Sequence, residues 1–383
     1  MKDIRNIRAE IDDIDSQLTQ LFQRRLEIVK QVAESKHERG APVTDPARER
    51  DILSRVTAAV DPEYEHGARL FFNTLFSISK ARQRVILNGE KPLVKAVRAA
   101  CEAKAGKRFP HRAVVACPGT EGAYAQQATS LLFPIPTILY FDGFEAVFEA
   151  VEKGVCPYGI LPIENSAAGS VTAVYDLMVR HKFHIVRALR LKIDHVLLAP
   201  RGTKLEDVKE ISSHPNALAQ CSKFLFAHPQ IKTVPELNTA MAAQSLAKSG
   251  RRDVAVIASR ECAELYGLEV IDGDVSDTLS NFTRFILISK RLEIYPDANK
   301  LSIIMNLGHR AGALADVLIR FAAAGVNLTK LESRPVPGSD FEFSFVFDVE
   351  ASPRDPAVVR LLSGFASDSS IERFAFLGAY AER

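Results

Sequence analysis

Apolar residues at the start of the chain recur alternately three and four positions apart. This spacing is the heptad pattern of a helix with one apolar stripe, and the helix is expected to end at Gly40-Ala41-Pro42. A helix of about 36 residues measures about 54 Å, and a single stripe of that length can be buried only by partner helices. The stripe consists of Ile4, Ile7, Ile11, Ile14, Leu18, Leu21, Ile28 and Val32.

Two further helices are expected before the pattern changes. Asp45-Pro46 has the residue types of a helix N-cap and first helical position, which predicts a short helix to about Val60. Apolar residues at helical spacing predict a third helix from about Glu63 to Leu87. Because no strand pattern interrupts this region, residues 1–91 are expected to form an all-helical domain.

The middle of the chain begins with a basic segment and then changes its period. Residues 92–111 are rich in lysine and arginine, as in a nucleic-acid-binding tail, but the run is short and a solvated linker helix is the favoured interpretation. Residues 112–291 alternate short apolar strands with helical stretches, one of them at Ala217–Ala227. This alternation predicts an α/β domain.

The last part of the chain, residues 299–383, has the pattern strand, helix, strand, strand, helix, strand. That order is typical of the ferredoxin-like α+β fold. Phe341, Phe343, Phe345 and Phe347 alternate strictly with other residues, so one face of their strand is expected to be aromatic and buried. The sequence therefore predicts a multidomain protein, first all-α, then α/β, then α+β.

Composition fits such a protein and excludes several classes. Apolar residues make up 47% and charged residues 25%, and the net charge of +2 gives no field that favours nucleic acid or a membrane surface. No apolar run approaches the roughly 18 residues of a membrane span, and the charged N-terminus lacks the apolar stretch of a signal peptide. The five cysteines form no C-x-x-C pair, which argues against a disulfide framework and favours a cytoplasmic protein.

Polar residues interrupt the apolar faces of the helical domain. The heptad predicts an apolar residue at position 25, where the chain has Arg25, and Ser79 and Gln83 interrupt the third helix in the same way. Lys36 follows Arg25 by 11 residues, which puts both cations on nearly one face, where they could clamp a small dianion. Arg8 lies about 25 Å from Arg25 along the helix, so it could serve the same site only from another chain.

These residues, with Ile7, Arg24 and the run from Asp45 to Glu49, resemble the all-helical chorismate mutase family. The resemblance implies an intertwined homodimer that converts chorismate to prephenate in a pericyclic step. It makes Arg8 and Arg25 the carboxylate anchors and directs Lys36 and Gln83 at the ether oxygen, where negative charge develops. The resemblance also implies that Arg48 supports a carboxylate. It implies that the ring hydroxyl and the anchors are oriented by Glu49, Asp45 and Ser79.

The α/β region shows no G-x-G-x-x-G loop and no metal-ligand spacing, so no cofactor and no metal are expected. Four motifs in order resemble prephenate dehydratase across the whole region, although Ala125 stands where a serine is usual. The resemblance implies two α/β lobes like those of a periplasmic binding protein, with the site in the cleft between them. The motifs are Gly119-x-x-Gly122-Ala123-Tyr124, Pro162-Ile163-Glu164-Asn165-Ser166, Ser213-His214-Pro215 with Gln220, and Asn281-Phe282-Thr283-Arg284-Phe285.

The reaction implied for this region removes CO₂ and the ring hydroxyl from prephenate to give phenylpyruvate, so the enzyme must help hydroxide leave. The resemblance makes Thr283 the positioned donor or relay and Arg284 an anchor for a carboxylate. Glu164 and Asn165 are expected to shape the cleft, with Glu164 as the alternative proton source. Further substrate contacts are expected from Ser213, Gln220 and Thr239.

Two short motifs in the C-terminal region resemble the phenylalanine-binding ACT domain. Gly312, Ala313 and Leu314 stand at an expected helix start, and Glu332, Ser333, Arg334 and Pro335 stand at an expected strand end. The resemblance implies feedback by L-phenylalanine bound between paired domains. The chain thus resembles a bifunctional mutase and dehydratase. The alternative is a non-catalytic sensor of aromatic ligands, and the intact polar set of the helical domain argues against it.

Overall fold

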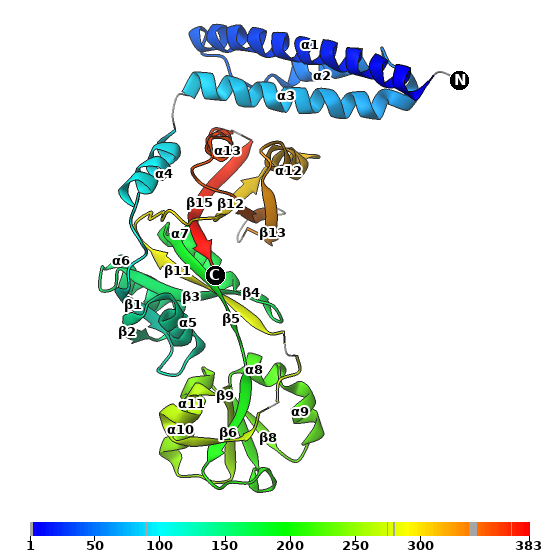
Figure 1. Ribbon diagram of the computed structural model, residues 1–383. Helices are drawn as coiled ribbons and strands as arrows, with labels where there is room; N and C mark the ends of the chain where they lie inside the picture. The colour runs from blue at the N-terminus through cyan, green and yellow to red at the C-terminus, as the bar shows by residue number, and fades with distance from the viewer. Residues whose placement is uncertain (1–2, 89–90, 274, 279, 337–342, 369) are drawn as a thin grey trace. The chain divides into compact units, whose positions relative to one another are not determined.

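The computed structural model forms two compact units, and Figure 1 shows its elements. The division falls inside three strands near the C-terminus, so the C-terminal region contributes residues to both units. The first unit comprises Met1–Arg98, Ile304–Phe347 and Arg354–Phe374, and the second Ala99–Ile303, Asp348–Pro353 and Ala375–Arg383. The structure describes residues 3–88, 91–273, 275–278, 280–336, 343–368 and 370–383.

The helical start of the chain is confirmed. Helix α1 (Ile4–Glu38) is followed by α2 (Pro46–Thr57), the short 3₁₀ helix η1 (Pro62–Tyr64) and α3 (Glu65–Asn88). The side chain of Asp45 caps α2 by accepting a hydrogen bond of 3.0 Å from the main-chain N–H of Arg48. The sequence placed this cap correctly because N-capping depends only on neighbouring residues.

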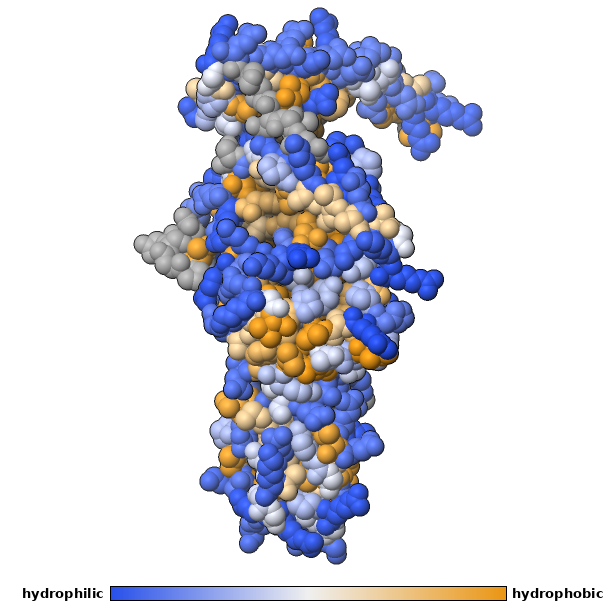
Figure 2. All heavy atoms as spheres, turned by 90° about the vertical axis from the view of Figure 1, so that its left-hand side faces the viewer, coloured by the Kyte–Doolittle hydropathy of each residue, from blue (hydrophilic) through white to orange (hydrophobic). Residues whose placement is uncertain are grey.

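Most of the apolar stripe of α1 is exposed among the residues that the structure describes. Ile14 is 55% exposed and Leu21 is 61% exposed, whereas Val29 and Ala33 are buried. No described helix spans a membrane. Apolar surface is not confined to α1, because hydrophobic patches interrupt the hydrophilic surface on the face shown in Figure 2.

The second unit begins within α4 (Pro92–Ala103) and continues as two α/β lobes. In the first lobe, strands pair in the order β5-β11-β3-β1-β2, and the antiparallel pairing of β3 with β11 sets Asn165 opposite Thr283. Its strands are β1 (Arg112–Pro118), β2 (Ile135–Phe141), β3 (Tyr158–Asn165), β5 (His184–Lys192) and β11 (Phe282–Ser289), with β4 (Gly169–Ser170) beside β3. Its helices are α5 (Tyr124–Leu132), α6 (Gly143–Glu152) and α7 (Thr172–His181).

The second lobe is a five-stranded sheet in the order β10-β6-β9-β7-β8. The strands are β6 (His195–Pro200), β7 (Glu210–Ser213), β8 (Lys232–Pro235), β9 (Val254–Ser259) and β10 (Leu268–Asp272). The helical elements are η2 (Leu205–Asp207), α8 (Pro215–Ala219), α9 (Ser222–Ala227), α10 (Thr239–Ser249) and α11 (Glu261–Tyr266).

The expectation of one helix over Ala217–Ala227 is wrong, because α8 ends and α9 begins within that range. The carboxylate of Asp277 accepts hydrogen bonds from the main-chain N–H groups of Ser222 and Lys223. A carboxylate at this position satisfies the free amides of a new helix start. The residue that caps the start of the second helix therefore lies more than fifty positions away in the sequence.

The predicted βαββαβ order of the C-terminal region is confirmed. It consists of β12 (Lys300–Leu307), α12 (Ala313–Ala323), β13 (Asn327–Pro335), β14 (Phe343–Glu350), α13 (Pro356–Ala366) and β15 (Ile371–Glu382). Phe341 lies outside the described residues, and of the other phenylalanines of β14 only Phe347 is fully buried, while Phe343 is 40% exposed. The expectation of one buried aromatic face is therefore wrong for Phe343. Residues on the opposite face, Val346 and Asp348, are themselves buried.

Candidate functional sites

Arg25, the charged residue on the apolar face of α1, finds its partners on α3. The guanidinium of Arg25 donates to the hydroxyl of Ser79 and, at 3.4 Å, to the carbonyl of Leu75. It also lies 6.0 Å from the ring centroid of Phe76. Burial lowers the pKa of Arg25, although a guanidinium remains charged at neutral pH. The structure thus brings together two of the polar residues that the sequence singled out.

Gln83 and Lys36 lie on the same two helices. Gln83 is buried one turn after Ser79, and its Oε1 has no hydrogen-bond partner among the described residues. A buried amide oxygen without a partner is costly and is expected at a site completed by a ligand. The Lys36 ammonium donates a hydrogen bond of 2.7 Å to the carbonyl of Val43, a residue of the segment between α1 and α2.

The other predicted mutase residues are more exposed. Glu49 on α2 pairs with Lys80 on α3 at 3.0 Å, and Arg48 pairs with Asp51 at 3.0 Å. Lys80 was missed by sequence reasoning, although its place between Ser79 and Gln83 was the signal that could have found it. Arg8 is exposed on α1, the same straight helix that carries Arg25.

The second site begins where β3 ends and β11 starts. The side-chain amide of Asn165 donates 2.9 Å to the hydroxyl oxygen of Thr283 and lies 2.8 Å from Asn281 Oδ1. Asn165 Oδ1 in turn accepts from the main-chain N–H groups of Ala167 and Ala168. Asn165 is therefore fixed from both ends, and it fixes the position of the Thr283 oxygen.

The second lobe extends this chain of hydrogen bonds. The side-chain amide of Asn281 donates a hydrogen bond of 2.9 Å to Gln220 Oε1. That oxygen lies 3.0 Å from His195 Nε2. The other ring nitrogen of His195, Nδ1, lies 3.1 Å from the Tyr124 hydroxyl. Burial lowers the pKa of His195, so its imidazole is neutral at pH 7. The sequence predicted Gln220, Asn165 and Thr283 here but gave His195 no role.

Arg284 and Glu164 lie on the other face of the sheet, because successive strand residues point to opposite faces. Arg284 is 5% exposed, and its Nη1 lies 2.5 Å from Asp348 and 3.4 Å from Glu164. Its Nη2 donates 2.8 Å to the Tyr380 hydroxyl. This position directs the guanidinium away from Thr283, so it gives the expectation that Arg284 anchors a substrate carboxylate no support.

Ser213 and Thr239 stand apart from the Thr283 cluster of hydrogen bonds. The Ser213 hydroxyl is buried and donates 2.5 Å to the carbonyl of Ile257, which gives it a structural partner. Thr239 opens α10, where the side chain of Asn238 accepts a hydrogen bond of 2.8 Å from the N–H of Met241. The Asn238 amide also lies 3.4 Å from where a side chain would begin at Gly119, so this helix start meets the first motif.

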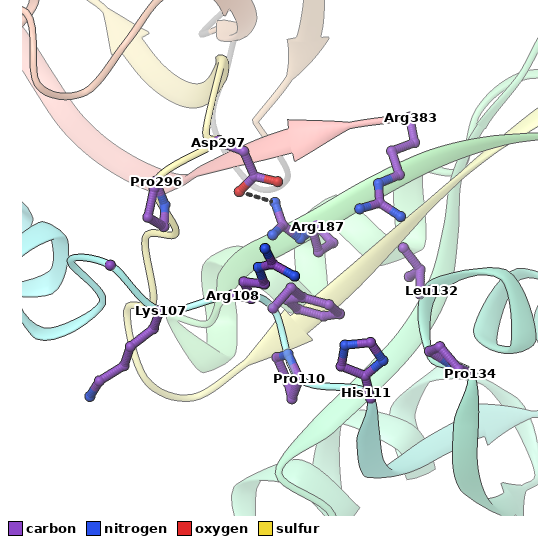
Figure 3. A pocket seen from close by; sticks show the side chains of 12 residues that line it. Lys107, Arg108, Pro110, His111, Leu132, Pro134, Arg187, Pro296, Asp297 and Arg383 are labelled. Atoms are coloured by element: carbon purple, nitrogen blue, oxygen red, sulfur yellow. Dashed lines mark ion pairs between the residues drawn. The ribbon is translucent and has the colours of Figure 1, made fainter.

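A cavity of 490 Å³ opens elsewhere in the second unit, and Figure 3 shows its lining, which contains no predicted site residue. Arg187 lines it and pairs with Asp297 at 2.9 Å. The same guanidinium lies 4.5 Å from the ring of Phe109 and 5.1 Å from that of Tyr295. These contacts give Arg187 a structural role, in which it fastens the segment after α4 to β5.

The two C-terminal motifs, Gly312 to Leu314 and Glu332 to Pro335, lie at a helix start and a strand end as predicted. Gly312 precedes α12 with φ +82°, a left-handed conformation that glycine adopts without strain, and Ala313 and Leu314 form the first turn. Glu332, Ser333, Arg334 and Pro335 end β13, with Glu332 paired to Lys330 at 3.0 Å.

Family models match three successive parts of the chain. Chorismate mutase type II matches residues 7–84, prephenate dehydratase residues 115–293 and the ACT domain residues 302–365. Arogenate dehydratase/prephenate dehydratase 2 of Arabidopsis thaliana is 36% identical over 271 residues, which cover 67% of this chain and 71% of the relative. The chain belongs to the prephenate dehydratase family.

One further relative extends beyond the dehydratase domain, and one solved structure can be compared. The bifunctional chorismate mutase/prephenate dehydratase of Escherichia coli (strain K12) is 29% identical over 354 residues, with 90% of this chain and 88% of the relative covered. The crystal structure of prephenate dehydratase in complex with L-Phe from Arthrobacter aurescens has a TM-score of 0.63 and 31% identity, and covers 70% of this chain and 89% of that one. The predicted order of mutase, dehydratase and ACT domains is confirmed.

Proposed function

We propose that this protein is a bifunctional enzyme that rearranges chorismate to prephenate and then converts prephenate to phenylpyruvate, with feedback inhibition by L-phenylalanine. The observation that carries the proposal is the pair of separate polar sites. One lies on α1 and α3 of the helical domain, and the other surrounds Thr283 in the dehydratase domain. The E. coli relative, named for both activities, covers nearly the whole chain.

The dehydratase site suits a reaction that must assist a leaving hydroxide. Because Asn165 donates to the Thr283 oxygen, the Thr283 hydroxyl hydrogen points to a different acceptor. The departing hydroxyl of prephenate is that acceptor, and Thr283 stabilises the charge that develops on it. Loss of CO₂ supplies the electrons that make the ring aromatic, so no cofactor is needed.

The mutase site suits a reaction without a base or a nucleophile. Chorismate is a small dicarboxylate, and its rearrangement is accelerated by holding one conformer and by donors at the ether oxygen. Arg25 is preorganised by Ser79 to hold one carboxylate. Lys36 and the Gln83 side chain then face the ether oxygen, and Glu49, held by Lys80, orients the ring hydroxyl.

The mutase is proposed to work as a homodimer. The exposed stripe of α1 is a long apolar surface of the kind that a second copy buries. A partner α1 would also bring Arg8 to the site of Arg25, which Arg8 of the same chain cannot reach along a straight helix. Paired ACT domains would form the phenylalanine site, with Gly312 to Leu314 of one chain facing Glu332 to Pro335 of the other. A cytoplasmic location is supported by the five cysteines, all buried and free.

A coupled assay tests the proposal. Purified protein supplied with chorismate should form prephenate and then phenylpyruvate, and supplied L-arogenate would test the substrate named for the Arabidopsis relative. Arg25→Ala should lower mutase turnover about 10²-fold or more, because it removes a preorganised charged donor, while turnover of supplied prephenate persists. A protein that binds these compounds without converting either would be the non-catalytic sensor instead.

A further inference from the structure

The residue next to Thr283 is tied to the C-terminal domain. Asp348 on β14, Tyr380 on β15 and Ser302 on β12 surround the Arg284 guanidinium, and all four side chains are buried. The Ser302 hydroxyl donates a hydrogen bond to Asp348, and the Ser302 oxygen lies 2.6 Å from the Tyr380 hydroxyl oxygen. The Tyr380 oxygen also accepts a hydrogen bond of 2.8 Å from Arg284. These four side chains, here called the Arg284 network, join β11 to three strands of the βαββαβ region.

The buried charge of Arg284 constrains the geometry of the Arg284 network. Burial alone would lower the pKa of Arg284, but Tyr380 and Asp348 outweigh it and raise the pKa, so the guanidinium is charged. A buried cation is tolerated only while its anion stays in place, and losing one partner is strongly destabilising. Asp348 is the nearest of three carboxylates around Arg284, at 2.5 Å against 3.4 Å for Glu164 and 3.9 Å for Glu382, so a shift of β14 displaces Arg284.

Thr283 shares this constraint through the backbone. Adjacent residues of a strand are about 3.8 Å apart at Cα and point to opposite faces. A displacement that Asp348 imposes on Arg284 therefore also moves the Thr283 oxygen relative to Asn165. The hydrogen bond between them is 2.9 Å long, so a shift of a fraction of an ångström changes the position of the donor.

We propose that Arg284 is a positioning residue, through which β12, β14 and β15 of the C-terminal domain set the place of the Thr283 hydroxyl. The inference rests on the proposed dehydratase function and deepens it, because it names the side chains by which an effector bound to the C-terminal domain reaches the reaction. It assigns Arg284 no contact with substrate.

Asp348→Asn tests the proposal from the side remote from Thr283. This variant keeps the shape of the side chain and removes its charge, and kcat for prephenate should fall about 10- to 100-fold with KM changed less than twofold, as expected for a misplaced catalytic group. The effect should vanish in a Thr283→Ala background, because the network acts only through Thr283. Additive losses in the double variant would overturn the proposal, as would a wild-type kcat in Asp348→Asn.

Arg190→Gln is the matched control. Arg190 on β5 pairs with Glu382 on β15 at 2.7 Å, so its loss also breaks an ion pair to the C-terminal strand, but at an exposed position and on another strand. Glu382 also lies 3.9 Å from Arg284 Nε, and in this variant it keeps its ion pair with Lys300. It should leave kcat unchanged. A fall equal to that of Asp348→Asn would assign the effect to general loosening of β15 and contradict the proposal.

A double replacement guards against misfolding and separates regulation from activity. Arg284→Met with Asp348→Leu replaces both charges by apolar side chains, which buried ion pairs often tolerate. Calorimetry should show that this variant binds L-phenylalanine as the wild type does, while its turnover no longer responds to the ligand. Retained inhibition would overturn the inference.

The proposed function can fail separately. If wild-type protein does not convert prephenate, that function is wrong, and the inference is judged by amide hydrogen exchange alone. L-Phenylalanine should then change the protection of residues 282–285 in the wild type and in Arg190→Gln but not in the double replacement. An equal response in all three proteins would contradict the Arg284 network as the link.

Discussion

Thr283 and Arg284 are neighbours in the chain, yet their side chains meet different surroundings. Asn165 holds the hydroxyl of Thr283 on one face, and Asp348 holds the guanidinium of Arg284 on the other. The sequence could name both residues because a local motif carries them. It could not assign Arg284 its partners, because Asp348 lies 64 positions further along the chain.

The Thr283 hydroxyl is open to a direct test. Thr283→Ala should depress kcat for prephenate with little change in binding, because the donor matters most in the transition state. Thr283→Ser keeps the hydroxyl and should retain much more of the turnover. Steady-state kinetics of both variants make the comparison, and an equal loss in the two would point to packing of the methyl group.

Other site residues show what a sequence can and cannot reveal. The interrupted seam identified Arg25 and Ser79, and the structure joins them. His195 escaped because a single histidine on a strand carries no local signal, and its neighbour Gln220 comes from another element of the fold. The Ser213 hydroxyl serves a main-chain carbonyl, a role that its motif does not announce.

At the scale of elements, periodicity predicted the helices and strands that local composition determines. It failed at the break between α8 and α9, where the distant Asp277 caps the start of α9. It also failed to pair β15 with β5, a parallel contact that sets Ala381 beside Arg187 and Glu382 beside Ala188. Strand partners far apart in sequence leave no trace in the period of either strand.

The contact of β15 with β5 depends on one glycine. Gly378 has φ +146°, and a Cβ there would lie 2.4 Å from the carbonyl oxygen of Ile185. Gly378→Ala should therefore lower the free energy of unfolding by about 3 kcal/mol or more, since the clash is with backbone that cannot turn aside. Urea unfolding followed by circular dichroism measures the loss.

Gly202→Ala is the control for this prediction. Gly202 also has a positive φ, of +78°, but a Cβ there would meet nothing within 4 Å. The free energy of unfolding of Gly202→Ala should fall only by the conformational cost of a left-handed alanine, about 1–2 kcal/mol. Equal losses in the two variants would show that backbone conformation alone, and not the approach of Ile185, explains the effect.

At the scale of the whole molecule, the exposed stripe of α1 makes a prediction about shared sites. Arg8→Ala and Arg25→Ala proteins should each lack mutase activity. Unfolded together and refolded as a mixture, they should regain up to about a quarter of it, because half of the dimers are hybrids and each hybrid has one intact site. Chorismate turnover before and after mixing measures this. If the refolded mixture shows no more activity than the sum of the two separate proteins, Arg8 and Arg25 belong to the same chain's site.

The place of β15 in the sheet also bears on how the protein is made. Strand β5 has β11 on one side and β15 on the other, and about 180 residues separate the end of β5 from the start of β15. At a synthesis rate of 5–20 residues per second, that edge of β5 waits roughly 10 to 40 seconds for its partner. An unpaired edge is a template for pairing with other chains, so nascent dehydratase domains crowded on one messenger RNA are most exposed to aggregation in this interval.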